Sequence, residues 1–167
     1  QNIRKKHSFL EICKTPEIAA EVARGPVDDF DFDAAILFSD ILFPIEAMGV
    51  DLKFDPGPVF SKYLLTREDL KSFKIPQYVE DFFSFQKDAL DKTRQVIGDE
   101  KSLITFVGGP FTLYYFAAAG RKKEYEQSVI KGLYDGRFED FTEKITEMIK
   151  RNIGVQLKSD VDTIAIL

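Results

Sequence analysis

Cysteine and histidine are nearly missing from this sequence, which contains one of each, Cys13 and His7. A single cysteine allows no disulfide within the chain and suits a reducing compartment, so we expect a cytoplasmic protein. A structural zinc site takes about four Cys or His ligands, so we expect none built within the chain. The same scarcity leaves no evident Ser-His-Asp or Cys-His nucleophile set.

Basic clusters and long apolar runs are also missing. The largest group of neighbouring cations is Arg121-Lys122-Lys123, and 23 Lys and Arg against 28 Asp and Glu give a formal net charge of −5. A nucleic-acid binder usually has a basic face, so we expect no nucleic-acid partner. No apolar run approaches the length of a membrane span, and no signal-peptide pattern opens the chain, so we expect no membrane association. The 44% hydrophobic and 31% charged composition indicates a globular chain.

Short apolar runs that alternate with helical patterns are what the sequence does contain. The runs at 34–38, 103–107 and 163–167 read as strands buried on both faces. Helical patterns cover 3–13, the stretch that starts at Thr15-Pro16-Glu17, 77–97, 110–119, 121–134 and 138–157. Because strands alternate with helices, we expect a parallel sheet with right-handed crossovers.

Two segments between these patterns have their own signals. Gly25-Pro26 should kink or interrupt the second helix. The connection 41–65 begins where the first strand ends, and it contains a short helix closed by Gly49, a strand at 52–54 and a turn at 55–58. A helix should begin at Thr66. Connections of this length are often lids or binding loops, although the aromatic residues in this one could equally form a small core of its own.

The sequence ends inside an apolar strand, 163–167. A (β/α)8 barrel typically takes about 250 residues. We therefore expect a partial (β/α)8 TIM barrel, roughly the N-terminal half, without its first segment and its C-terminal strands. Residues 1–167 would be one incomplete domain. The alternative is a small open α/β sheet that is complete as given.

The first two strands end in candidate site residues. In α/β folds, ligands bind at the carboxyl ends of strands, where Ser39-Asp40 and Gly108-Gly109-Pro110 lie. Glycine lets backbone approach a ligand closely, and a helix starting at Pro110 favours anions at its N-terminus. The simpler alternatives are a helix cap at Asp40 and an ordinary strand-to-helix turn at Gly108-Gly109, which matches no P-loop or Rossmann fingerprint. Glu46 could be a second carboxylate, or it could face solvent.

Four blocks of the sequence, in this order and approximate spacing, resemble one enzyme family. They are His7-Ser8-Phe9-Leu10-Glu11-Ile12-Cys13-Lys14-Thr15-Pro16-Glu17, Phe32-Asp33-Ala34-Ala35-Ile36-Leu37-Phe38-Ser39-Asp40-Ile41-Leu42, Gly57-Pro58-Val59-Phe60 and Phe106-Val107-Gly108-Gly109-Pro110-Phe111-Thr112-Leu113. The family is uroporphyrinogen decarboxylase, and its fold is a (β/α)8 barrel. The second block is the most specific.

The resemblance implies a carboxy-lyase that works without a cofactor. The family removes carbon dioxide from the four acetate side chains of uroporphyrinogen to give coproporphyrinogen in haem biosynthesis. Asp40 matches the family's central aspartate, which makes it the candidate catalytic residue. Phe38, Phe106 and Phe116, with Gly108 and Gly109, are the other expected substrate-binding residues. The resemblance also implies a homodimer for the full-length protein.

Two departures from the family pattern leave alternatives open. An Arg-Gln-Ala-Gly-Arg-Tyr segment, whose arginines bind the substrate carboxylates, is absent, so we expect this polypeptide alone to be inactive. Phe116 stands where the family usually has tyrosine, and Tyr115 cannot simply replace it, because one residue turns a helical side chain by about 100°. The alternatives are a zinc- and corrinoid-dependent methyltransferase of the same superfamily, or a tetrapyrrole-binding pseudoenzyme.

Overall fold

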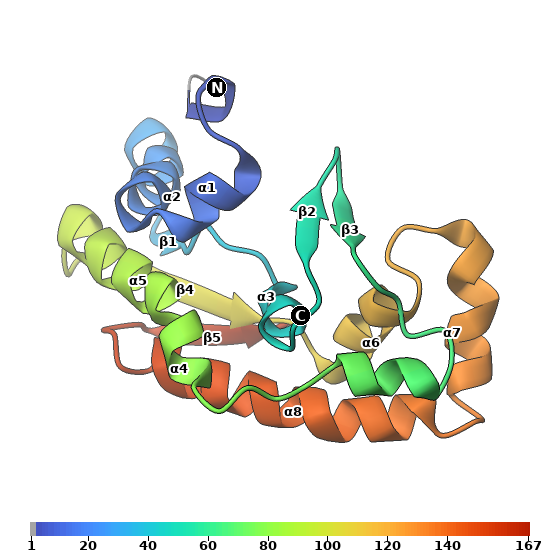
Figure 1. The fold of residues 1–167 in the computed structure, drawn as a ribbon. Coiled ribbons are helices and arrows are strands. Elements are labelled where there is room, and N and C mark those ends of the chain that lie inside the picture. The colour runs from blue at the N-terminus through green and yellow to red at the C-terminus, as the bar shows by residue number, and fades with distance from the viewer. Residues whose placement is uncertain (1–2) are drawn as a thin grey trace. The chain divides into compact units, whose positions relative to one another are not determined.

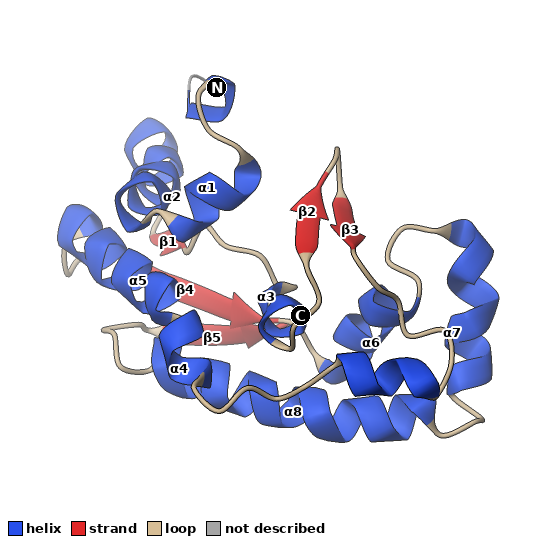
Figure 2. Cartoon of the chain, in the orientation of Figure 1, coloured by secondary structure: helices blue, strands red, loops and turns tan. Residues whose placement is uncertain are grey.

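The structure is a computed structural model that describes residues 3–167. The chain folds as two compact units. The first contains the described residues up to Asp40, residues 80–107 and residues 152–166, and the second contains residues 41–79, residues 108–151 and Leu167. Figures 1 and 2 show the helices and strands of the chain.

A parallel sheet lies at the centre of the first unit. Its strands are β1 (Ala34–Ile36), β4 (Ser102–Val107) and β5 (Thr163–Ile166), in the order β1-β4-β5. Both pairs are parallel, with Ile36 opposite Ile104 and Phe106 opposite Ala165. Parallel strands that follow one another in chain order, with helices between them, form a partial (β/α)8 barrel. The predicted fold class is therefore confirmed (Figure 2).

Helices α2 (Pro16–Phe30) and α5 (Ser84–Ile97) pack against each other in the first unit. The remaining helical elements of this unit are η1 (Ile3–Lys5), α1 (Phe9–Lys14), most of α4 (Val79–Phe82) and the last turn of α8 (Arg137–Gln156). Small and branched residues of α2, α5, β1 and β4 form its core: Ala19, Val27, Ala35, Leu37, Ala89, Leu90 and Leu103. Helix α1 begins in a capping box, in which the Ser8 hydroxyl and the Glu11 carboxylate each accept the other residue's backbone N–H.

Three predictions for the first unit need correction. The segment 3–13 forms a 3-10 turn and then α1, and the segment 77–97 forms α4 and α5, which Phe83 separates. Helix α2 is not interrupted at Gly25-Pro26, and it ends only at Asp31, whose φ is 51°. Proline removes one helical N–H, but Pro26 is exposed, and Val22, whose carbonyl this N–H would have bonded, is only half-buried.

β1 and β5 are shorter and less buried than predicted, whereas β4 begins one residue before the predicted run. β1 ends at Ile36, although the Leu37 N–H still donates to the Ile104 carbonyl at 2.9 Å. Ile36 is 55% exposed, and Ile166 in β5 is 66% exposed. Each of these exposed side chains leaves one face of its strand uncovered, so neither β1 nor β5 is buried on both faces.

The second unit contains an antiparallel hairpin and several helices. Strands β2 (Leu52–Phe54) and β3 (Pro58–Phe60) flank the predicted turn at Asp55-Pro56-Gly57. The helical elements are α3 (Phe43–Ala47), η2 (Glu68–Ser72), α6 (Pro110–Ala118), η3 (Lys123–Tyr125), α7 (Glu126–Gly132) and α8 up to Arg151. The helix predicted from Thr66 is the 3-10 helix η2, and the one predicted at 121–134 is η3 followed by α7. Gly49 closes α3 with a φ of 92°, as predicted.

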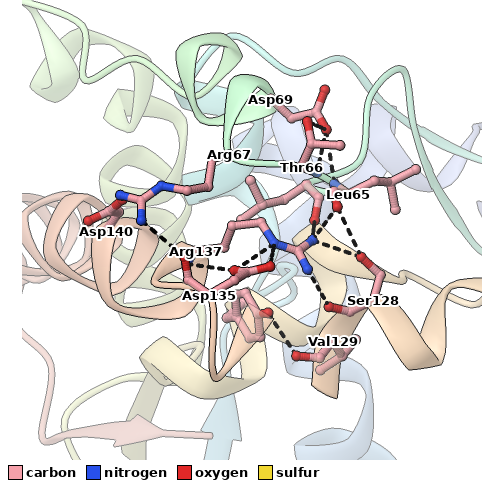
Figure 3. Close-up of polar contacts among 11 residues, drawn as sticks. Leu65, Thr66, Arg67, Asp69, Ser128, Val129, Asp135, Arg137 and Asp140 are labelled. Carbon is pink, nitrogen blue, oxygen red and sulfur yellow. Dashed lines mark hydrogen bonds and ion pairs between the residues drawn. The ribbon is translucent and has the colours of Figure 1, made fainter. Parts of the chain in front are cut away.

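A buried guanidinium group connects three segments of the second unit (Figure 3). Arg137 is 2% exposed, and its Nη1 donates to the Leu64 carbonyl at 3.0 Å and to the Ser128 hydroxyl at 2.8 Å. It also donates to the Leu65 carbonyl, the Ser128 carbonyl and the Asp135 carboxylate. Hydrogen bonding to Arg137 lowers the pKa of the Asp135 carboxyl. Arg137 therefore holds the start of α8, α7 and the chain at 64–65 together.

Candidate active site at the carboxyl ends of the strands

The chain leaves the sheet through Phe38, Ser39 and Asp40. The last ladder contact of β1 is the hydrogen bond from the Leu37 N–H to Ile104, and the next three residues form no regular structure. All three are half-buried. Asp40 thus lies just past the carboxyl end of a strand, which is where parallel α/β folds bind their ligands. This position agrees with the prediction, while its catalytic role stays a proposal.

Phe38 and Phe106 have different surroundings. Phe38 lies two residues beyond the end of β1 and packs against the core cluster of the first unit. Phe106 lies on the face of β4 that also carries Ile104, because side chains alternate along a strand. This face is the less buried one, since Leu103, Thr105 and Val107 are buried while Ile104 and Phe106 are half-buried. The Phe38 ring also packs edge-to-face on Phe9, with ring centroids 5.7 Å apart, so part of its surface already has a protein partner.

The lone thiol of the chain lies near Asp40. Cys13, in α1, is 1% exposed. Burial raises the pKa of the Cys13 thiol to about 12, and the negative charge of Asp40 contributes in the same direction. A neutral, buried thiol is a poor nucleophile and a poor metal ligand. Cys13 therefore acts as a packing residue near Asp40, in the segment that follows β1.

A set of buried polar side chains ends in a hydrogen bond to Ser39. The sequence analysis did not identify this set. The Gln86 Nε2 donates to the Ser39 hydroxyl oxygen at 2.9 Å, and the Asn152 Nδ2 donates to the Gln86 Oε1 at 2.6 Å. Gln156 follows, because its Nε2 donates to the Asn152 Oδ1 and its Oε1 accepts from the Thr105 hydroxyl at 2.6 Å. We call these five residues, Ser39, Gln86, Asn152, Gln156 and Thr105, the buried amide chain.

One signal in the sequence could have revealed this set. On α5 the buried stripe is Gln86, Ala89, Leu90 and Thr93, so a glutamine occupies a core position of an otherwise apolar stripe. On α8, Asn152 and Gln156 are spaced four residues apart and therefore share one face of the helix. A buried amide requires hydrogen-bond partners, which makes such positions informative.

Gly108 and Gly109 lie at the start of α6 in the second unit. A Cβ on Gly108 would lie 2.7 Å from the Leu113 side chain and 3.3 Å from the Ile41 Cβ. Glycine at position 108 is therefore required by packing within the protein. Gly109 is the N-cap residue of α6, and its N–H donates to the Leu167 carbonyl at 2.6 Å. Packing accounts for Gly108 without a ligand, whereas the hydrogen bond of Gly109 does not require a glycine. The predicted role of both residues in substrate binding stays a proposal.

Phe116 is half-buried on α6, next to the Tyr115 ring. The helix runs unbroken from Pro110 to Ala118, so the two side chains point in different directions. Tyr114 is fully buried and donates to the Val129 carbonyl at 2.9 Å. The structure thus places Phe38, Asp40 and Phe106 in the first unit, and Gly108, Gly109 and Phe116 in the second.

Residues 3–167 contain neither a membrane-spanning helix nor a group of side chains arranged to bind a metal ion. No helix there is long and apolar enough to cross a membrane. No group of three or more His, Cys, Asp or Glu side chains in the same residues is arranged to hold a metal ion. Glu46, the other carboxylate considered, is half-buried in α3 of the second unit.

Comparison with solved structures supports the fold. A methyltransferase from Methanosarcina mazei superposes with a TM-score of 0.72 at 19% sequence identity, over 93% of this chain and 46% of that protein. At this identity the likeness concerns the fold alone. It agrees with a barrel of which this chain covers one part.

Comparison with curated sequences is more specific. Uroporphyrinogen decarboxylase from Geobacter sp. strain M21 is 41% identical over 166 residues, which are 98% of this chain and 49% of that protein. The enzyme of the same name from Citrifermentans bemidjiense is 40% identical over the same shares. The chain therefore spans about half the length of the curated relatives that it matches. The family model described as uroporphyrinogen decarboxylase (URO-D) matches residues 1–167, and the chain belongs to this family.

Proposed function

We propose that the full-length protein removes carbon dioxide from the acetate side chains of uroporphyrinogen III and forms coproporphyrinogen III. The observation that carries this proposal is Asp40, which follows a parallel strand in a chain of the uroporphyrinogen decarboxylase family. Because the chain spans half of its curated relatives, we propose that it supplies one part of the site and is inactive alone.

The chemistry suits an aspartate at this position. A porphyrinogen turns its pyrrole N–H groups toward the centre of the macrocycle, and one ionised carboxylate can accept several of them. The pyrrole gains positive charge when its ring carbon is protonated, before carbon dioxide leaves. A fixed negative charge stabilises that state, as oxyanion holes stabilise the opposite charge. Asp40 would thus bind the substrate and stabilise the charged intermediate, with no cofactor required.

The other predicted residues would shape the site. Phe38 and Phe106 are both half-buried, and they would form an apolar surface for the macrocycle. Gly108 and Gly109 would bring backbone close to the substrate, and Phe116 would contact it as a ring without the hydroxyl. A homodimer is proposed from the family resemblance, and a cytoplasmic location from the single cysteine.

Substitution of Asp40 tests this proposal in the full-length protein. We expect Asp40→Asn to keep the fold and to lower turnover of uroporphyrinogen by about 100-fold or more, because loss of one preorganised electrostatic group typically costs 10²–10³-fold. Turnover is measured by chromatography of the oxidised porphyrin products. Asp33→Asn is the matched control, since Asp33 is exposed and precedes β1 at the opposite end of the strand. Near-normal turnover by Asp40→Asn would refute the assigned role.

A further inference from the structure

The buried amide chain holds more polar groups than packing requires. Thr105 and Gln156 are 0% exposed, Asn152 is 1% exposed and Gln86 is 3% exposed. A buried amide without partners is destabilising, and apolar residues of similar size would fill the same space without that risk. A fully connected set of hydrogen bonds instead rigidifies and orients what it contacts.

The hydrogen bonds of the buried amide chain all donate in one direction, and the last one is donated to Ser39. The Thr105 hydroxyl donates to Gln156, Gln156 donates to Asn152, and Asn152 donates to Gln86. The Gln156 amide nitrogen also approaches the Gln86 oxygen at 3.4 Å. Because the Gln86 oxygen receives these donors, its nitrogen must face the other way, toward the Ser39 oxygen at 2.9 Å. The orientation of Gln86 is therefore set by its partners.

The buried amide chain ends at Ser39, just after the point where the hydrogen bonds between β1 and β4 stop. After Leu37 bonds Ile104, no further ladder bond holds β1, and Asp40 comes three residues later. Gln86 anchors the residue directly before Asp40 to α5, while Gln156 reaches the carbonyl of Phe106 at 3.5 Å on the neighbouring strand. The same set of side chains thus contacts the exits of both β1 and β4.

We propose that Gln86 is a positioning residue for Asp40 and that it acts through the Ser39 hydroxyl. This inference rests on the proposed function, because it assigns Gln86 the task of fixing the carboxylate that faces the substrate. Gln86 itself touches no substrate. Misplacement of a reacting group by about 1 Å can lower a rate by 10²-fold, so loss of this anchor should lower turnover even where the fold survives.

Two substitutions in one helix separate positioning from stability. We expect Gln86→Leu in the full-length protein to lower kcat by about 10- to 100-fold and to change KM by less than about threefold, because substrate contacts remain. Thr93→Val is the matched control. Thr93 is also fully buried on α5, and its hydroxyl donates only to the Ala89 carbonyl. Thr93→Val should lower the melting temperature yet keep kcat within about twofold.

Substitution of Ser39 tests the route and covers the case in which Gln86→Leu does not fold. Ser39→Ala should lower kcat to the level of Gln86→Leu, and the double variant should have a kcat no lower than either single variant. Ser39→Thr keeps the hydroxyl and should therefore retain most of the wild-type kcat. Equal kcat in Gln86→Leu and Thr93→Val would overturn the proposal, as would deficits that multiply in the double variant. If Asp40→Asn is inactive while Gln86→Leu is normal, only this inference fails. If Asp40→Asn is active, the proposed function fails.

Discussion

Replacement of Arg137 by methionine is the most direct test of how the second unit is held together. Arg137→Met keeps most of the aliphatic stem but removes every donor of the guanidinium group. The Leu65 and Ser128 carbonyls and the Asp135 carboxylate would lose a partner (Figure 3). The Leu64 carbonyl would lose one too. None of the three carbonyls belongs to a fully exposed residue, so water replaces the lost donors incompletely.

The size of the effect follows from these contacts. Each buried acceptor left without a donor costs about 1–3 kcal/mol, but such costs do not add fully, and breaking a buried ion pair typically costs about 3–5 kcal/mol. The Asp135 side chain is 44% exposed and can be solvated, which removes part of the electrostatic cost. We therefore expect Arg137→Met to lower the free energy of unfolding by about 3–5 kcal/mol. This is a large share of the 5–15 kcal/mol typical of a domain.

The chain supplies both a probe and a control for this measurement. It has no tryptophan and six tyrosines, and all of these tyrosines lie in the second unit: Tyr63, Tyr78, Tyr114, Tyr115, Tyr125 and Tyr134. Tyrosine fluorescence in urea therefore reports on that unit. Arg67→Met is the control, because Arg67 bonds Asp140 and the Asp135 carbonyl from an exposed position and should cost at most about 1 kcal/mol. If the two variants lie within 1 kcal/mol of each other, the argument from burial is wrong.

Two further results are expected. Gly132→Ala should destabilise the protein by about 1–3 kcal/mol, because the new Cβ would lie 1.9 Å from the Tyr114 hydroxyl oxygen. Tyr114→Phe in the same chain should remove much of that cost. Equal costs of Gly132→Ala with and without Tyr114→Phe would contradict this. Cys13 should resist alkylation at pH 8 until urea unfolds the chain, as followed by mass spectrometry. Since burial raises the pKa of Cys13 to about 12, stability should fall as pH rises from about 9 to about 12, and Cys13→Ala should lose that slope in urea titrations.

The parallel sheet could be predicted because its signal is local. Short runs such as Leu103-Ile104-Thr105-Phe106-Val107 have one feasible placement once helices alternate with them, and β4 extends only one residue beyond that run. Burial was harder to predict, because it depends on which elements cover each face. Ile36 lies in an apolar run and yet is more than half exposed, which no local pattern could indicate.

Helix boundaries differed where two local effects compete. Gly25-Pro26 disfavours a helix, but its exposed position makes the lost hydrogen bond inexpensive, so α2 continues. At Phe83 the expected long helix breaks, although no glycine or proline marks the point. Tertiary packing decides such cases, and propensity alone is a weak guide.

Only part of the candidate site could be predicted from the sequence. Asp40 could be located because it follows a strand and belongs to a recognisable block of residues. The residues that support Asp40 were missed: Gln86 on the buried stripe of α5 indicates a buried amide, but its partners become apparent only when strands and helices assemble. For Gly108, the expected ligand contact competes with a simpler cause, the close approach of Leu113.

The buried amide chain also has a consequence for how the protein is made. Apart from the bond between Gln156 and Asn152, its hydrogen bonds join residues that are 47 to 70 positions apart, and Asn152 and Gln156 come last in the sequence. Chains emerge from the ribosome N-terminus first, so Gln86 can meet Ser39 long before its own oxygen has a partner. The strand exit that bears Asp40 would then stay loosely held on the nascent chain until the final turn of α8 has been synthesised.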